Sequence, residues 1–214
     1  MSALYVFAIT RDRSIGFEWQ GHHVECAAIG GAVAFFERTV ERPRLSEAAL
    51  RLQHDIVLHI ATSVNAILPV RFGAFIERAE LEHLLNARGE TIQRALDEVS
   101  DRVQMTVRVR DGVSQLAESP PAPAPASGTA YLERRRADVR GPMSEAAQAA
   151  SAAVHHLVVR ERFERNADRP GVIYHLVHRN DVTEYRKLLT SLPASTTTVT
   201  GPWPPFAFAP DLWP

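Results

Sequence analysis

The sequence predicts an α+β protein. Residues 47–65 carry apolar side chains at helical spacing, residues 103–110 alternate apolar and polar side chains as a strand does, and a Pro/Ala-rich segment separates the two ends of the chain. A chain of 214 residues suits one large domain or two small ones. We therefore expect an N-terminal mixed α+β domain over residues 1–110, a linker or surface insertion over 111–128, and a C-terminal domain over 129–214.

The first forty residues predict a small antiparallel sheet. Leu4–Ile9 is a compact apolar run that is typical of a strand. Arg11–Gly21 is polar and punctuated by glycine, which predicts a loop. Val24–Ile29 and Ala32–Val40 are two further strands joined at Gly30–Gly31, a pair that favours a tight hairpin turn.

The aromatic pair Phe35 and Phe36 occupies consecutive positions of the third predicted strand. Neighbouring strand residues point to opposite faces, so the pair indicates burial on both faces or one face turned towards a partner. After Pro43, Ser46 is a good helix N-cap, and a helix is expected from Glu47 to about Asn65.

The segment Ile67–Ile76 is the centre of the N-terminal domain. Pro69 lacks a backbone donor and disfavours helix in the residue before it, so an extended segment should begin here. Arg71 lies among apolar neighbours and must be paired or lie at an edge. Gly73 permits a bulge or a close backbone approach. The physical interpretation is a buried strand with an arginine at its edge.

Two short helices, around Leu81–Leu85 and Ile92–Val99, follow with a break at Arg88–Gly89. Val103–Arg110 then predicts a strand with one buried and one polar face. The segment Ser119–Gly128 is rich in proline and alanine and is expected to be extended.

Five elements are expected in the C-terminal domain. Apolar spacing, Ala-rich composition, capping residues and β-branched runs predict helices at Thr129–Ala137, Ser144–Arg165 and from Asn180 or Asp181 to Leu189, and strands at Gly171–His178 and Thr196–Thr200. The tail Gly201–Phe208 holds three prolines and cannot form a regular helix. It either packs on its own domain or offers Trp203 and Phe206 to a partner.

Composition excludes several classes of function. The net charge of -1 argues against a general nucleic-acid binder, and no apolar run approaches the length of a membrane span. The N-terminus lacks the pattern of a secretory signal, so an intracellular soluble protein is expected. Cys26 is the single cysteine, and His54 and His59 are badly spaced for a shared metal. We expect no catalytic group, metal or cofactor, and hence no enzyme.

Two segments resemble signatures of a known family. Leu68–Gly73 reads Leu-Pro-Val-Arg-Phe-Gly, and Thr200–Phe208 reads Thr-Gly-Pro-Trp-Pro-Pro-Phe-Ala-Phe. Both resemble motifs of the gas vesicle protein F/L family, although that family has Tyr at the position of Phe206. Ala130–Arg135 also looks like a helix start of the family. The resemblance covers nearly the whole chain.

This resemblance implies an accessory protein of gas vesicle assembly, located in the cytoplasm and associated with vesicles. Such proteins are thought to bind the small hydrophobic shell subunit during nucleation, together with other accessory proteins, and to end as minor vesicle components. The implied C-terminal domain is ferredoxin-like. The segment before Gly171 is shorter than the family pattern, which leaves open whether a strand found there in relatives is present.

The residues expected to meet a protein partner are aromatic or arginine side chains. They are Phe35, Phe36, Arg71, Phe72, Trp203 and Phe206. Two other hypotheses remain open. One is an enzyme or small-ligand binder on a ferredoxin-like sheet, suggested by nine histidines and by Arg71, and it requires a pocket where His54 or His59 faces Arg71. The other is a purely structural vesicle component.

Overall fold

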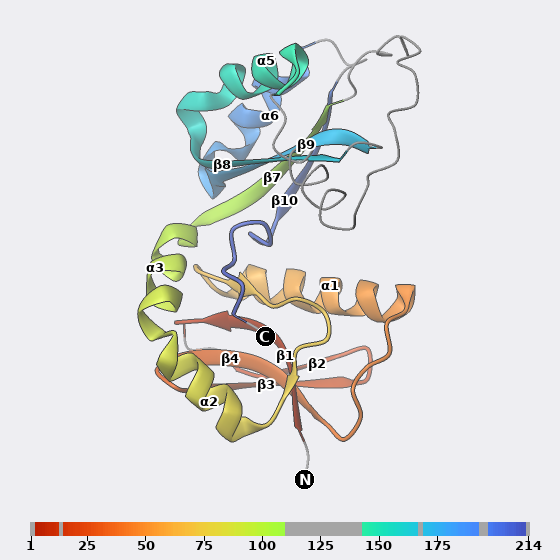
Figure 1. Ribbon diagram of the computed structural model, residues 1–214, viewed down its shortest axis with the longest axis vertical. Coiled ribbons are helices and arrows are strands. Elements are labelled where there is room, and N and C mark those ends of the chain that lie inside the picture. Colours follow the sequence, from red (N-terminus) through yellow and green to blue (C-terminus); the bar gives the residue numbers. More distant parts are fainter. Residues whose placement is uncertain (1–2, 13–14, 110–142, 167–168, 193–196, 213–214) are drawn as a thin grey trace, which may run out of the picture. The chain divides into compact units, whose positions relative to one another are not determined.

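The computed structural model describes residues 3–12, 15–109, 143–166, 169–192 and 197–212 (Figure 1). They form two compact units, Met1–Val103 together with Trp203–Pro214, and Gln104–Pro202. The α+β class is confirmed, because each unit combines helices with a sheet. The tail belongs to the first unit, whereas the sequence grouped it with the C-terminal domain. The Pro/Ala-rich segment 111–128 and the helix predicted at Thr129–Ala137 lie outside the described residues.

The first unit is built on an antiparallel sheet with the strand order β2-β3-β4-β1-β5, and β6 also pairs with β1. Its strands are β1 (Ala3–Thr10), β2 (Phe17–Trp19), β3 (His22–Ile29), β4 (Ala32–Thr39), β5 (Leu68–Pro69) and β6 (Phe75–Ile76). Its helices are α1 (Glu47–Ser63), α2 (Arg78–Ala87) and α3 (Gly89–Val99). None of the helices in the described residues is long and apolar enough to cross a membrane.

Glycines set the predicted hairpin between β3 and β4. Gly30 and Gly31 have φ angles of 56° and 76°, as a type I′ turn requires. A Cβ on Gly30 would lie 2.8 Å from the Leu85 side chain of α2, so the helix also packs against this turn. The loop predicted over Arg11–Gly21 was wrong in part, because β2 lies inside it. Three residues are too few to show an alternating pattern.

Helix α1 begins where the sequence predicts, with the Ser46 side chain accepting the Ala49 N–H at 3.1 Å. Figure 1 shows α1 lying across one face of the sheet, where its apolar side pairs with Tyr5, Phe7 and Phe35 in one buried cluster. Phe36 is also fully buried. Of the two alternatives for the pair Phe35 and Phe36, burial on both faces of β4 is the one observed.

The central segment forms two short strands rather than one. Val70 N donates to Phe7 O at 2.9 Å, and Val6 N donates to Ala74 O at 2.9 Å, so both ends of the segment pair with β1. Residues Arg71–Gly73 leave the strand between these bonds, and Gly73 has a φ of 93°. We call these three residues the Arg71 bulge.

The second unit carries a four-stranded sheet in the order β10-β7-β9-β8. Its elements are β7 (Arg102–Val109), α5 (Glu145–Val154), the short 3-10 turns η1 (His155–Leu157) and η2 (Arg179–Asp181), β8 (Val158–Asn166), β9 (Arg169–His178), α6 (Val182–Thr190) and β10 (Thr197–Trp203). Among the described residues the order β-α-β-β-α-β and this strand order are those of a ferredoxin-like unit. The resemblance-based expectation of the fold is confirmed.

Two predictions for the second unit were wrong. The helix predicted over Ser144–Arg165 ends at Val154, and after the turn η1 the chain forms β8, so the strand whose presence was left open does exist. Its charged residues have good helix propensity, but pairing with β9 over its length overrides that preference. Strand β7 was expected to have a polar exposed face, yet Gln104 and Thr106 are buried and, among the described residues of that face, only Arg108 is exposed.

A buried polar cluster lies in the second unit. The fully buried His175 ring contacts the Tyr185 hydroxyl through Nδ1 at 2.6 Å and the Glu161 carboxylate through Nε2 at 2.8 Å. A neutral imidazole with its proton on Nε2 satisfies both contacts, since it donates to Glu161 and accepts from Tyr185. Burial lowers the pKa of His175, although Glu161 opposes the shift, and burial raises the pKa of Tyr185.

Replacing Gly73 by alanine should destabilise the first unit by about 1–2 kcal/mol, because a residue with a Cβ is strained at this positive φ. Space is not the cause, since the nearest atom to an added Cβ is Arg42 Nη2 at 3.9 Å. Gly89→Ala at the start of α3 is the matched control and should cost nothing, because it has open space and helical geometry. Urea unfolding measures both, and equal losses would contradict the strain argument.

The cluster at His175 should make stability depend on pH. His175 takes up a proton near pH 6.5 in the unfolded chain and only at lower pH in the folded chain. Its contribution to the free energy of unfolding is therefore fully present above about pH 6.5 and falls as the pH drops below that value. The contribution to the slope is at most about 1.4 kcal/mol per pH unit. In thermal or urea unfolding from pH 7.5 to 5, His175→Gln should show a flatter pH profile than the wild type. The exposed His178→Gln should leave the profile unchanged.

Candidate functional site

Buried polar groups hold the Arg71 bulge on the side that faces the core. The Tyr5 hydroxyl donates to Gln53 Oε1 and accepts the Gly73 N–H at 3.3 Å. Gln53, on the inner side of α1, donates through Nε2 to Val70 O at 2.7 Å. Burial raises the pKa of Tyr5, which keeps its hydroxyl protonated as a donor. Helix α1, strand β1 and the bulge are thus joined by hydrogen bonds inside an otherwise apolar cluster.

Arg42 holds the bulge from the outside. Its Nη2 donates to Gly73 O at 2.7 Å and its Nε to the same oxygen at 3.3 Å. Both the N–H and the C=O of Gly73 therefore have partners, as a fixed backbone conformation requires. The bulge is a preorganised feature and presents the Arg71 side chain to solvent, where it is 79% exposed.

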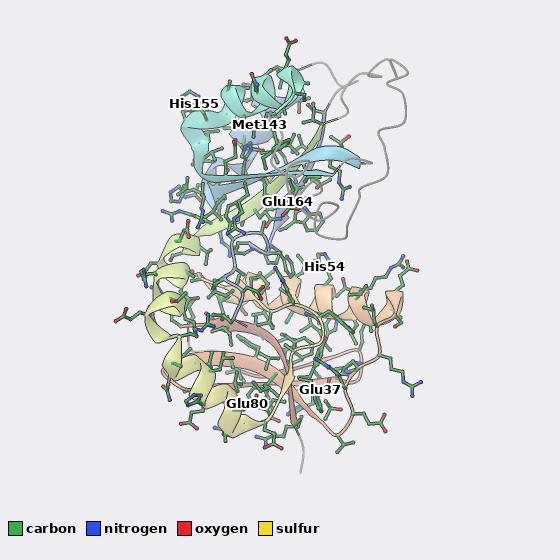
Figure 2. All side chains as sticks on the ribbon, in the orientation of Figure 1. Glu37, His54, Glu80, Met143, His155 and Glu164 are labelled. Carbon is green, nitrogen blue, oxygen red and sulfur yellow. The ribbon has the colours of Figure 1, made fainter. Side chains whose placement is uncertain are left out.

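A surface pocket of about 380 Å³ lies beside the bulge. Its apolar lining includes the half-buried rings of Phe72 and Phe75, and its charged lining consists of Arg42, Arg71, Glu80 and Asp211. Phe72 packs edge-on against Tyr5, with ring centroids 6.0 Å apart. Figure 2 labels Glu80, which comes from α2. The pocket thus combines an aromatic lining with charges of both signs at its rim.

The C-terminal tail packs on the same unit. Phe208 and Leu212 are buried, while the Trp203 and Phe206 rings contact His54 with centroid distances of 5.5 Å and 6.1 Å. Figure 2 labels His54 on α1. Tail residues 209–212 line a narrow gap of about 20 Å³ against Leu68–Arg71 of the central segment. The tail packs within the chain, but on the first unit, whereas from the sequence we expected it to pack on its own C-terminal domain or to meet a partner.

An ion pair links the tail to the bulge. Arg71 Nη1 lies 3.3 Å from Asp211 Oδ2, and the Asp211 side chain is 61% exposed. Phe206 of the second signature segment lines the adjacent gap with Leu68–Arg71 of the first, so residues of both segments meet on one surface. We call Arg71, Phe72, Trp203 and Phe206 together the Arg71 surface.

Four of the six candidate interaction residues lie on the Arg71 surface, and Phe35 and Phe36 lie in the core. Sequence reasoning missed Arg42 and Asp211, which contact the bulge, and Gln53, which holds Val70 beside it. Only Gln53 left a signal, as a polar residue within the apolar stripe of α1. Arg42 and Asp211 are charged residues of irregular segments, and their partners depend on tertiary structure.

The histidines do not form the site that a small-ligand hypothesis requires. His59 contacts the rings of Phe17 and Trp19, and the lining of the pocket beside Arg71 includes neither His54 nor His59. In the part of the chain that the structure describes, no group of three or more His, Cys, Asp or Glu side chains could hold a metal ion.

Comparisons with known proteins agree with the two signature segments. The family described as "Gas vesicle synthesis protein GvpL/GvpF" matches residues 3–210. Gas vesicle protein L of Streptomyces sp. (strain CB03234) is 29% identical over an alignment of 247 positions. The alignment covers 96% of this chain and 92% of that protein.

Two crystal structures of the gas vesicle protein GvpF are similar in fold. That from Anabaena sp. PCC7120 has a TM-score of 0.74 at 14% identity and covers 98% of this chain and 99% of its own. That from Microcystis aeruginosa has a TM-score of 0.74 at 12% identity and covers 97% and 99%. Since the match to the family spans almost every residue, from the first strand to the tail, this chain belongs to the GvpL/GvpF family of gas vesicle synthesis proteins.

Proposed function

We propose that this protein binds the hydrophobic shell subunit during the nucleation of gas vesicles and keeps it from aggregating until it is assembled. The observation that carries the proposal is that residues of both signature segments meet at the Arg71 surface, where Phe206 of the second segment lines a gap with Leu68–Arg71 of the first. A shell subunit with a large apolar surface needs a cover before assembly. Membership of a family of gas vesicle synthesis proteins supports this role.

The chemistry of the Arg71 surface suits such a contact. Arginine and aromatic side chains are the commonest anchors of protein interfaces, and here Arg71 lines both the pocket with Phe72 and the gap with Phe206. Phe206 is 37% exposed and stacks on His54, so it presents a ring face without being free to move. A ring already held in place loses little freedom when a partner covers it.

The backbone of the Arg71 bulge is likewise held in place before a partner binds. It is fixed by Tyr5 and Arg42, and Gln53 fixes Val70 beside it. Binding would therefore cost little ordering of the backbone, and the contact energy would go into affinity. Other accessory proteins of the vesicle are the natural further partners of a surface of this kind, and we propose that some copies remain as minor vesicle components.

Co-expression with the shell subunit tests the binding directly. The tagged chain should retain the shell subunit on affinity capture, and cells lacking the chain should form fewer vesicles. If some copies stay with the vesicle, they should remain on isolated vesicles after a salt wash. Absence of the shell subunit from the captured material, together with normal vesicles in the deletion strain, would refute the proposed function.

Phe206→Ser should weaken capture of the shell subunit about tenfold, which is typical for loss of an aromatic anchor at an interface. The fold should survive, because Phe208 and Leu212 hold the tail in the core. Affinity is measured by titration with the purified shell subunit in mild detergent, and folding by circular dichroism.

The matched control is Val159→Ser in β8, which also removes a partly exposed apolar side chain, 45% exposed, but lies in the second unit. It should bind like the wild type. Equal weakening by both substitutions would point to general surface hydrophobicity instead of the Arg71 surface.

A further inference from the structure

Arg71 carries more hydrogen-bonding capacity than its contact with Asp211 uses. A guanidinium group has five N–H donors, and within the described residues Arg71 makes one hydrogen bond, of 3.3 Å, to a single carboxylate oxygen. Both side chains are largely exposed, and such ion pairs are weak. Asp211 is therefore a carboxylate that a better-placed competitor can replace.

The pocket beside this ion pair is shaped for more than one side chain. Its volume of about 380 Å³ is within the range of about 300–1,000 Å³ found for binding pockets. The rings of Phe72 and Phe75 offer an apolar wall, and the guanidinium of Arg42 is fixed at the rim by Gly73 O. An apolar side chain and a carboxylate could be accommodated together.

The charges of the pocket depend on where Asp211 lies. With Asp211 in place, Arg42 and Arg71 are balanced by Glu80 and Asp211. Once Asp211 is displaced, two guanidinium groups face the single carboxylate of Glu80, and the pocket favours an acidic occupant. The protein's own Asp211 already demonstrates that Arg71 accepts a carboxylate at this position.

We infer that the pocket beside the Arg71 bulge recognises a partner segment in which an acidic residue is next to a bulky apolar one. The partner's carboxylate binds Arg71 in place of Asp211, and its apolar side chain contacts Phe72 and Phe75. Asp211 thus competes with the partner for Arg71. The inference rests on the proposed function, because it specifies the chemistry of the partner and a self-contact that limits its affinity.

The probes are two blocked dipeptides, acetyl-Phe-Glu-amide and acetyl-Phe-Gln-amide, titrated separately into the full-length chain labelled with ¹⁵N. The Arg71 and Arg42 Nε–H signals and the Gly73 amide signal report on the pocket. We expect saturable shifts with the Glu peptide at millimolar concentration and clearly weaker binding of the Gln peptide. Arg71→Gln should abolish this difference.

Asp211→Asn should tighten binding of the Glu peptide about twofold to fivefold, the range that follows from the strength of an exposed ion pair. The matched control is Asp97→Asn, which removes the same charge from another exposed ion pair of the first unit, with Arg11. It should leave the affinity unchanged. Glu80→Gln should also tighten binding of the Glu peptide, because it removes a like charge from the pocket.

Equal binding of the two peptides, or an Asp211→Asn variant that binds no better than Asp97→Asn, would overturn the inference. Capture of the shell subunit by the wild-type chain is measured in parallel. Successful capture with no discrimination between peptides would refute this inference and leave the proposed function standing. Failure of capture, together with normal vesicles in the deletion strain, would refute the proposed function whatever the result with the peptides.

Discussion

The surface of the first unit at Arg71 depends on the two hydrogen bonds made by the side-chain amide of Gln53. This amide lies in a cluster of aromatic and aliphatic side chains and uses both ends, accepting from the Tyr5 hydroxyl and donating to Val70 O. An amide left without partners in such surroundings would be costly, so α1 can dock only where the backbone of the central segment meets it. The same constraint fixes the position of Gly73, because Tyr5 holds its N–H. What the protein presents to solvent at Arg71 is therefore determined in the core.

Much of this fold could be predicted from local patterns. The strands at the N-terminus, the Gly30–Gly31 turn and the Ser46 cap each depend on residues close in sequence, and all were confirmed. The errors arose where tertiary partners decide. The charged stretch that forms β8 has helix propensity, and it is a strand because β9 pairs with it. Gln104 and Thr106 alternate with apolar residues as exposed side chains would, and yet both are buried.

The candidate site shows the same division. Local chemistry correctly indicated that Pro69 begins an extended segment and that Gly73 permits a bulge. Which segments pack together decides that Phe35 and Phe36 lie in the core. It also decides that Trp203 and Phe206 pack near His54. Arg42 and Asp211 lie in irregular segments without a periodic pattern, so composition and spacing carry no information about their partners. Only the resemblance between both signature segments and one family suggested that they belong to a common function.

The return of the tail to the first unit affects the order in which the molecule can be completed. Asp211 lies 140 positions after Arg71, and the whole of the second unit is synthesised between them. While the ribosome is still making that unit, His54 and the outer side of β5 have no tail to cover them. Contacts of such long sequence separation close slowly. The newly made chain therefore passes through a period in which the face that later carries Phe206 is bare.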